Sequence, residues 1–301
     1  MTIEQEIKER ARSLGFFQCG IAKAEPLVDE EQKNREMIAK GYHAYKSYLE
    51  NNIEKRFNPT LVVPEAKSVI VCLYNYLTNV HLNSDYKMAK YSFITDYHTL
   101  IRDKLTLLAH FIHQQSPDTA YKISVDSSIV TEKNWAVRAG LGFIGKNSLL
   151  QTPQGSYFLI GTITTPLLLT PDTPIKADCG ACKRCMDACP THAIKAPYQI
   201  DARKCISHLN TEAKNLESSE VEYDSKWLIG CDICQEVCPH NVNAPLSEDA
   251  TKHLAPFIHF KNEDFNTLSE EDFKRYFIGT CLERRKYHHF MTSIKNAKKQ
   301  L

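Results

Sequence analysis

The spacing of the cysteines constrains the fold of this 301-residue chain more than any other feature. Eight of its eleven cysteines fall into two runs, and a proline follows the last cysteine of each run. The first run contains Cys179, Cys182, Cys185 and Cys189, and the second contains Cys205, Cys231, Cys234 and Cys238. The first spacing is the signature of bacterial ferredoxins that hold two [4Fe–4S] clusters. The sequence therefore predicts a ferredoxin-type unit with two such clusters.

The same spacing predicts which cysteines share a cluster. In these runs the fourth cysteine serves the other cluster. Three cysteines on a tight turn can wrap three corners of one cubane, whereas the next cysteine, on the following helix, points away. One cluster is therefore predicted to be held by Cys179, Cys182, Cys185 and Cys238. The other is predicted to be held by Cys189, Cys205, Cys231 and Cys234.

Zinc binding and disulfide bonding are the alternative uses of such cysteines. Zinc sites usually take two ligand pairs rather than a triplet followed by Cys-Pro. Disulfides need an oxidising compartment, and Met1–Arg12 is polar and charged, without the apolar stretch of a secretory signal. No apolar run approaches the ~18 residues of a membrane span. We expect a reduced, cytoplasmic protein that does not engage a membrane.

Composition and length limit what the rest of the chain can be. It is 43% hydrophobic and 24% charged, as in ordinary globular proteins, and its net charge is +1. A polyanionic partner must therefore be met by a local patch rather than by a global field. The chain is long enough for about two domains. The cysteine region is only part of it, so the electrons are expected to serve a second unit.

Hydrophobic periodicity predicts strands that alternate with helices before the cysteines. The expected helices are Thr2–Leu14, Glu30–Leu49, Asp96–Gln114 and Lys133–Ala139, and the expected strands are Phe16–Ala22, Lys67–Tyr76, Tyr121–Val125 and Ser156–Thr165. Three prolines between 166 and 174 mark the next boundary. We predict an α/β domain over 1–165, a ferredoxin-type domain over 166–245 and a helical C-terminal segment over 246–301, with Phe257–Leu301 helical.

Three cysteines lie outside the runs. Cys19 and Cys72 fall in predicted strands, where free cysteine behaves as a small hydrophobe, and we expect them to be structural. Cys281 lies near Arg284 and Arg285, so for this thiol a reactive role stays open.

Three polar stretches look unlike plain core. Residues 53–59 read as a loop before a strand, Asp126 ends a predicted strand, and residues 139–148 contain three glycines that let backbone approach a ligand. The glycine-rich stretch lacks the Walker spacing, and a short helix rather than a strand precedes it, which disfavours a nicotinamide site. Asp126 is either a turn former or an acid beside a ligand pocket, and the sequence leaves both open.

Taken together, the polar stretches resemble the epoxyqueuosine reductase family. The resemblance rests on Glu54-Lys55-Arg56, Asp96-Tyr97-His98, Val125-Asp126, residues 138–147, Cys205-Ile206-Ser207 and residues 230–241. It implies that the α/β domain binds cobalamin beside the two clusters. It also implies that the chain reduces epoxyqueuosine, at the wobble position of tRNA anticodons, to queuosine.

The resemblance also implies roles for single residues. Asp126 matches the family's catalytic acid. The implied cobalamin contacts are Arg56, Asp126, Lys146, Asn147, Ser148, Leu150, Ser207 and Asp232. The implied partners are an epoxyqueuosine-containing anticodon stem-loop and a low-potential electron donor that the sequence does not identify.

Two departures from the family pattern affect the expectations. Many members have Thr-Gly-Pro after the acid, where this chain has Ser127-Ser128-Ile129, so the loop is expected to take a different path. Longer members also add a helical repeat, whereas this sequence ends at Leu301. We expect tRNA phosphates to meet the basic C-terminal residues, although lysines there also suit a solvated helix end. These residues are Arg284, Arg285, Lys286, Lys295, Lys298 and Lys299.

The implied chemistry sets a requirement on Asp126. Removing an epoxide oxygen takes two electrons and two protons, with a strong reductant at carbon and an acid at oxygen. Cob(I)alamin would supply the first, and the clusters would deliver electrons singly. Asp126 must then hold a proton at working pH, and we expect burial against the corrin to raise its pKa.

Three rival functions remain open at this point. A reductive dehalogenase would share the cofactors but usually carries a twin-arginine leader, which Met1–Arg12 lacks. A non-enzymatic electron carrier would bind iron but not cobalamin. An RNA-binding module with structural clusters would bind tRNA without turnover.

Overall fold

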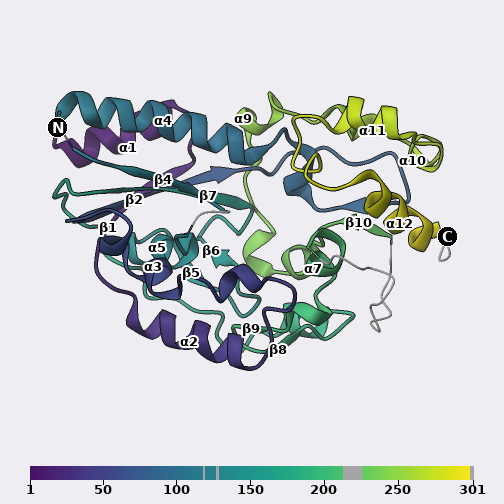
Figure 1. Cartoon of the computed structure of the whole chain (residues 1–301), viewed down its shortest axis with the longest axis horizontal. Coiled ribbons are helices and arrows are strands. Elements are labelled where there is room, and N and C mark those ends of the chain that lie inside the picture. The colour runs from purple at the N-terminus through teal and green to yellow at the C-terminus, as the bar shows by residue number, and fades with distance from the viewer. Residues whose placement is uncertain (118, 127–128, 213–225, 299–301) are drawn as a thin grey trace.

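The computed structural model describes residues 1–117, 119–126, 129–212 and 226–298 (Figure 1). Its helices are α1 Ile3–Ser13, α2 Val28–Ala39, α3 Ile53–Phe57, α4 Tyr97–Gln115, α5 Glu132–Arg138, α6 Arg184–Asp187, α7 Ile206–Thr211, α8 Ile233–Glu236, α9 Glu248–Thr251, α10 Asn262–Asn266, α11 Glu270–Phe277 and α12 Tyr287–Lys298. Its strands are β1 Gln18–Lys23, β2 Ser68–Asn75, β3 Lys87–Met88, β4 Lys122–Val125, β5 Phe143–Ile144, β6 Leu150–Gln151, β7 Phe158–Thr165, β8 Ile194–Ala196, β9 Gln199–Ile200 and β10 Trp227–Ile229.

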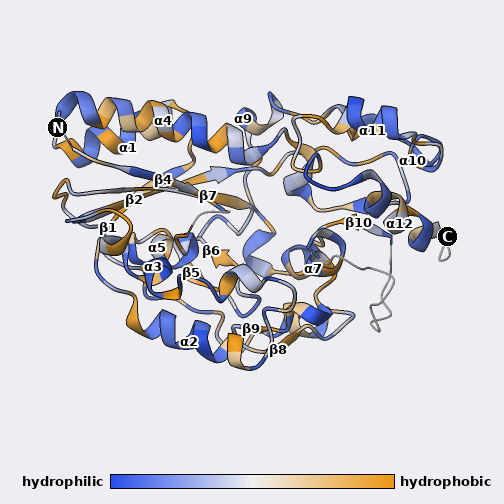
Figure 2. Ribbon diagram, in the orientation of Figure 1, coloured by the Kyte–Doolittle hydropathy of each residue, from blue (hydrophilic) through white to orange (hydrophobic). Residues whose placement is uncertain are grey.

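The α/β domain is built on a four-stranded sheet in the order β1-β2-β7-β4, and every pairing in it is antiparallel. All eight residues of β2 are buried, as expected for a central strand covered on both faces. Helices α1 and α4 lie over one face, and α3 and α5 lie on the other side (Figure 1). Figure 2 shows hydrophobic residues along the central strands and mostly hydrophilic residues on the outer helices α2 and α11.

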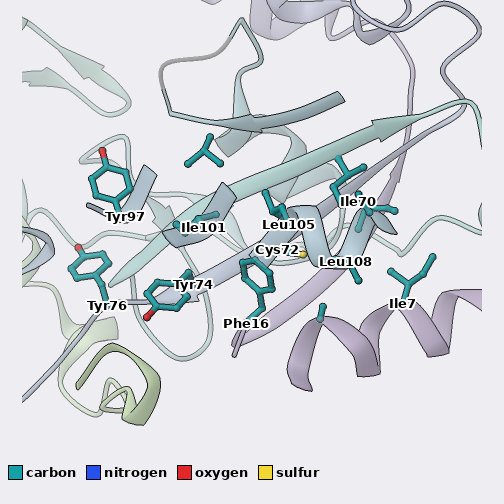
Figure 3. Close-up of a cluster of buried hydrophobic side chains, with 14 of the residues drawn as sticks. Ile7, Phe16, Ile70, Cys72, Tyr74, Tyr76, Tyr97, Ile101, Leu105 and Leu108 are labelled. Atoms are coloured by element: carbon teal, nitrogen blue, oxygen red, sulfur yellow. The ribbon is translucent and has the colours of Figure 1, made fainter. Parts of the chain in front are cut away.

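The core between the sheet and α4 fixes the start of that helix. Ile101, Leu105 and Leu108 are fully buried against β2 (Figure 3). Helix α4 also approaches the backbone of β7 closely, because a Cβ on Gly161 would come within 2.6 Å of Leu105. Truncating one of these leucines to alanine is expected to cost about 2–5 kcal/mol. This packing holds the N-terminal turn of α4 beside the end of β4.

The C-terminal segment does not stand apart from the first half of the chain. Strand β10, which precedes this segment, pairs with β3 in parallel, and its Leu228 and Ile229 join the same core cluster as the C-terminal helices. Helices α10 to α12 contribute an aromatic cluster, with Phe265, Phe273 and Phe290 buried, that packs against Tyr86 and Phe93. The domain limits 1–165, 166–245 and 246–301 therefore stay a prediction, because packing crosses the last of them.

The structure differs from the expected elements in three places. The helix expected over Glu30–Leu49 ends at Ala39, where Gly41 takes a left-handed φ of 66°, and the chain continues through turns to a short 3-10 helix at Ser47–Leu49. The loop expected over residues 53–59 contains α3, since Glu54, Lys55 and Arg56 favour helix until Pro59. The helix expected over Phe257–Leu301 is divided into separate helices, and residues 299–301 lie outside the described part.

Candidate active site

Asp126 lies directly after β4, at the edge of a large cavity. Its backbone is in the left-handed region, with φ of 49°, a conformation that non-glycine residues adopt uncommonly and aspartate more readily than most. Its side chain is 61% exposed, toward that cavity. The hydroxyl of Tyr97 donates to Asp126 Oδ2 at 3.0 Å, and His98 Nε2 lies 2.9 Å from the same oxygen. An acid, an imidazole and a phenol therefore meet at one point.

The beginning of α4 supplies both partners of Asp126. Asp96 is the N-cap of α4, and its carboxylate accepts the backbone N–H of His98 at 3.0 Å. The same oxygen lies 2.6 Å from His98 Nδ1. The ring of His98 is thus held between two carboxylates, and its side chain is only 8% exposed. Because each ring nitrogen faces a carboxylate, the arrangement favours the doubly protonated imidazolium.

The charges of this group determine where the proton rests. Burial acts to lower the pKa of His98, but hydrogen bonds and charge from Asp126 and Asp96 outweigh it, and the pKa is raised. Burial acts to raise the pKa of Asp126, but His98 and the Tyr97 hydroxyl outweigh it, and the pKa is lowered. The expectation that burial against the corrin raises the pKa of Asp126 stays a prediction for the cofactor-bound state. In this structure both shifts favour a proton on His98, one hydrogen bond from Asp126.

The cavity beside Asp126 has a volume of about 670 Å³, within the ordinary range for ligand sites. Parts of the chain that are far apart in sequence form its wall. The segment before α3 contributes Lys46 and Tyr48, and the C-terminal segment contributes Arg284, Lys286 and neighbours. Arg56, which also lines the cavity, donates to the carbonyl oxygen of Tyr48 at 2.8 Å. The cavity is therefore both aromatic and basic.

The cysteines predicted to share the first cluster line one small cavity. These residues are Cys179, Cys182, Cys185 and Cys238. Cys238 comes from the second run, so the chain brings it across as the spacing predicts. Polar groups surround the sulfurs: the backbone N–H of Lys146 donates to Cys179 Sγ at 3.5 Å, and Cys238 Sγ donates to Gln151 Oε1 at 3.7 Å. The donor set suits a thiolate-ligated cluster.

The second predicted set also gathers, at a more buried place. Burial raises the pKa of Cys231 to about 12, and the neighbouring Cys205 and Cys189 add to the effect. Burial likewise raises the pKa of Cys234, with Cys231 and Cys205 nearby. These electrostatic neighbours place the four cysteines of the second set near one another. Their assignment as ligands remains a proposal.

The glycine-rich stretch lies against the first cysteine set. Lys146 Nζ donates to the carbonyl oxygens of Gly180 and Cys182, at 2.6 and 2.9 Å, and Asn147 donates to the carbonyl of Cys234 at 3.4 Å. Lys146 and Asn147 line the small cavity with the cysteines. Among the described residues, the implied cobalamin contacts that line the large cavity are Arg56 and Asp126.

The remaining implied contacts lie behind the large cavity. The carbonyl of Ser148 accepts Lys133 Nζ at 2.8 Å, and Leu150 is buried in β6. The carbonyl of Ser207 accepts the hydroxyl of Thr211, which lines the cavity. Asp232 is buried and accepts the backbone N–H of Lys90 at 2.7 Å, and burial raises its pKa to about 6. Their role toward cobalamin stays a prediction.

Sequence reasoning missed several cavity residues. Tyr97 and His98 stood in a motif that was recognised without a role, and their spacing from the N-cap Asp96 was the available signal. Lys46, Tyr48 and Tyr91 carried no local signal, because only the folded chain brings them to Asp126.

Comparison with known proteins agrees with both parts of the site. Residues 56–127 match the family model of epoxyqueuosine reductase QueG, and residues 178–241 match that of the 4Fe-4S double cluster binding domain. The chain is 40% identical, over 94% of each chain, to an epoxyqueuosine reductase of Leadbetterella byssophila. It is 35% identical to that of Synechocystis, over 89% of this chain and 95% of the other.

Solved structures give the same result. A crystal structure of epoxyqueuosine reductase with an epoxyqueuosine-modified tRNA-Tyr stem loop superposes with a TM-score of 0.87 at 30% identity, covering 98% of this chain and 80% of that one. The Streptococcus thermophilus enzyme superposes with the same TM-score at 29% identity, covering 99% and 81%. The chain belongs to the epoxyqueuosine reductase family.

Proposed function

We propose that this chain reduces the epoxide of epoxyqueuosine in a tRNA anticodon to the alkene of queuosine. The observation that carries the proposal is the Asp96–His98–Asp126 group in the wall of a large cavity, in a chain of this family. The relative solved with an epoxyqueuosine-modified stem loop supports the choice of substrate. The chain is accordingly an oxidoreductase with two [4Fe–4S] clusters.

Cobalamin is the cofactor that the cavity fits. A macrocycle with an apolar face and amide side chains needs both apolar and polar walls. Tyr91, Ile229 and Leu282 supply the first, while Lys46, Tyr48 and Arg56 supply the second. Cobalamin, when bound, supplies the reductant for carbon–oxygen cleavage. We propose that Arg56 and Asp126 contact it directly, and that Lys146, Asn147, Ser148, Leu150, Ser207 and Asp232 hold the wall between it and the clusters.

The residues of the chain provide the acid chemistry. Loss of the epoxide oxygen as water consumes two electrons and two protons. The Asp126 carboxyl group lines the cavity, and His98 Nε2 is the nitrogen that can pass a proton to its Oδ2. Asp96 then holds the other ring nitrogen and keeps the imidazole oriented. Because the pKa of Asp126 is lowered, its carboxyl group gives up a proton readily and does not retain one. His98, whose pKa is raised, therefore holds the proton until it is transferred.

The turnover experiment tests the function as a whole. Anaerobic protein, loaded with iron and cobalamin, is mixed with epoxyqueuosine-containing tRNA and a strong reductant, and nucleosides are quantified by mass spectrometry. We expect queuosine to appear only when cobalamin and reductant are both present. Binding of tRNA without turnover would favour an RNA-binding module instead.

The raised pKa of His98 predicts a pH dependence. The charged pairs of His98 stabilise the fold below about pH 6.5, the ordinary pKa of histidine, and this contribution is lost as pH rises through the higher folded pKa. The rate should fall over the same interval, because the proton store empties. In His98→Asn we expect this alkaline limb to disappear and the rate to drop by about 100-fold.

The control for this prediction is His259→Asn, which alters an exposed histidine away from the site. Single-turnover rates and urea midpoints are measured for each variant as a function of pH. A His98→Asn variant that keeps the alkaline limb would exclude His98 as the group that titrates.

The basic C-terminal residues divide into two groups. Arg284 and Lys286 are exposed and line the cavity, whereas Arg285 is only 9% exposed. Lys295 is exposed on α12, Lys298 ends that helix, and Lys299 lies outside the described residues. We propose that Lys286 and Lys295 bind tRNA phosphates while the anticodon base enters the cavity.

Reversing the charge of Lys286 and Lys295 to glutamate is expected to weaken tRNA binding and to flatten its salt dependence. Each lost phosphate contact should reduce the slope of log affinity against log salt by about 1. Lys274→Glu on α11, an exposed lysine outside the cavity, is the matched control. An unchanged affinity and slope in the double variant would place the tRNA on another face.

We also propose a cytoplasmic location, because two such clusters and eleven cysteines suit a reducing compartment. No helix among the described residues is long and apolar enough to span a membrane. The electron donor is proposed to be a low-potential carrier. Fractionation of cells that express the protein tests the location.

A further inference from the structure

Two cysteines outside the cluster runs face each other in the central sheet. Strand β1 pairs with β2 in antiparallel register, and Cys19 lies directly opposite Cys72. Both side chains are on the sheet face covered by α1 and α4, where Cys72 lies among apolar residues (Figure 3). Neither belongs to the predicted ligands, and the proposed reaction uses neither.

The hydrogen-bond pattern shows which kind of opposed pair this is. In an antiparallel ladder, hydrogen-bonded and non-hydrogen-bonded pairs alternate. The N–H of Ala24 donates to the carbonyl of Lys67, so that pair is hydrogen-bonded. Cys19 is an odd number of residues from Ala24 and therefore falls in a non-hydrogen-bonded pair. On the other side, the N–H of Tyr76 donates to the carbonyl of Tyr157, directly before β7. Tyr76 is an even number of residues from Cys72, so the backbone N–H of Cys72 points toward β7 as well.

Non-hydrogen-bonded pairs bring side chains closest. Their Cα atoms lie about 4.5 Å apart, inside the range of about 4.4–6.8 Å that disulfides span. Burial raises the pKa of Cys72, and the neighbouring Cys19 adds to the effect. The backbone therefore needs little movement for the two sulfurs to bond.

One of the two thiols is accessible in a basic setting. Cys19 is partly exposed and lines a cavity of about 150 Å³ together with Lys8 and Arg12. The ammonium group of Lys8 is paired with Asp172. Arg12, the other cation in the cavity wall, has an exposed side chain. These cations suit an anionic reagent, and Cys19 is the thiol that such a reagent can reach from the cavity.

We propose that Cys19 and Cys72 form a redox-active dithiol that a small anionic disulfide, such as glutathione disulfide, converts to a cross-strand disulfide. The Cys19 thiolate attacks one sulfur of the reagent, the reagent's S–S bond breaks, and one thiol leaves. Cys72 then attacks the Cys19 sulfur, and the second thiol leaves. The protein loses two electrons and two protons, and the reagent gains both.

A disulfide between Cys19 and Cys72 is expected to affect residues beyond β1 and β2. A Cβ on Gly20, next to Cys19, would lie 2.3 Å from the carbonyl oxygen of Ala139, so β1 rests directly on the start of the glycine-rich stretch. That stretch continues to Lys146, which holds the loop of the first cysteine set. A disulfide restricts the movement of β1 relative to β2, and we expect it to alter this contact.

The test uses the cluster-loaded protein under anaerobic conditions, with glutathione disulfide as the oxidant, followed by alkylation and trypsin digestion. Cleavage releases peptides 13–23 and 68–87, each with a single cysteine. We expect these peptides to be linked, two hydrogens lighter than their sum, with iron content unchanged. Cys19→Ser and Cys19→Ala should abolish the link, whereas Cys281→Ser should not.

Several results would overturn the proposal. Cys19 carrying only glutathione, or both cysteines remaining alkylated, would show that the thiols do not meet. A link that appears only in proportion to iron loss would belong to damaged protein. On oxidation, hydrogen exchange in residues 139–148 is expected to change by about threefold or more. Unchanged exchange beside a formed link would overturn the coupling to the glycine-rich stretch.

Discussion

Replacing Asp126 with asparagine is expected to lower the rate of epoxyqueuosine reduction by about 100-fold or more, the usual contribution of a positioned acid. Asparagine has the same shape as aspartate, and its side-chain oxygen can still accept the hydrogen bond that the Tyr97 hydroxyl donates. It also tolerates the left-handed φ of 49° at this position, so the backbone has no reason to move. The variant loses only the ability to take a proton from His98 and pass it on.

The controls separate this role from a structural one. Asp103→Asn removes a carboxylate from the exposed side of α4 and should leave turnover unchanged. For Asp126→Asn, iron content and the visible spectrum of bound cobalamin should equal those of the wild type. Turnover at the wild-type rate would rule out Asp126 as the acid. Normal iron with lost cobalamin would make Asp126 a cofactor-binding residue instead.

The behaviour of His98 should differ from that of Asp126 in one respect. Asp126→Asn breaks the hydrogen-bonded path that runs from His98 through Asp126 to the cavity, so its residual rate should not depend on the pKa of His98. His98→Asn leaves Asp126 able to take protons from water, so any remaining pH dependence should follow the pKa of Asp126 rather than that of His98. The two variants together therefore test the direction of proton flow.

The sequence predicted well the features that depend on neighbouring residues, and it predicted poorly the contacts between residues far apart in the chain. The cysteine spacing predicted that Cys238 lies beside Cys179, and both line the same small cavity. Short loops of fixed length bring them together. Strand β4 and the position of Asp126 at its end followed from β-branched residues and a polar end. The Asp126–His98 pair joins residues 28 positions apart, and only the packing of α4 on the sheet creates it.

Other misses have equally specific causes. The helix over residues 30–49 ended early because a charged pattern alone does not reveal a left-handed glycine at 41. The place of His98 beside Asp126, which lowers the pKa of Asp126 in this structure, could not be read from periodicity. The C-terminal helices gained their stability from Tyr86 and Phe93, far away in sequence, so their breaks were invisible locally.

Removing the two crossing cysteines is expected to have the largest effect on the cofactors. The loaded protein should contain about eight iron atoms per chain, and loss of one cluster should leave about four. Cys238 lies with the first-run cysteines, so Cys238→Ala should damage the same cluster as Cys185→Ala. Cys189 neighbours Cys231, so Cys189→Ala should damage the other one. Either loss interrupts electron delivery, and turnover should stop.

The pattern of damage, more than its size, tests the assignment. Electron paramagnetic resonance of the reduced variants should show one signal in Cys238→Ala and Cys185→Ala, and a different one in Cys189→Ala and Cys231→Ala. Cys281→Ser, which removes a thiol outside both sets, should retain about eight iron atoms. If Cys238→Ala instead shared its signal with Cys231→Ala, each run would hold its own cluster and the crossing would be wrong. Iron near four in the wild type, or stoichiometric zinc, would contradict two clusters altogether, because four thiolates fit one zinc ion as readily as one cubane.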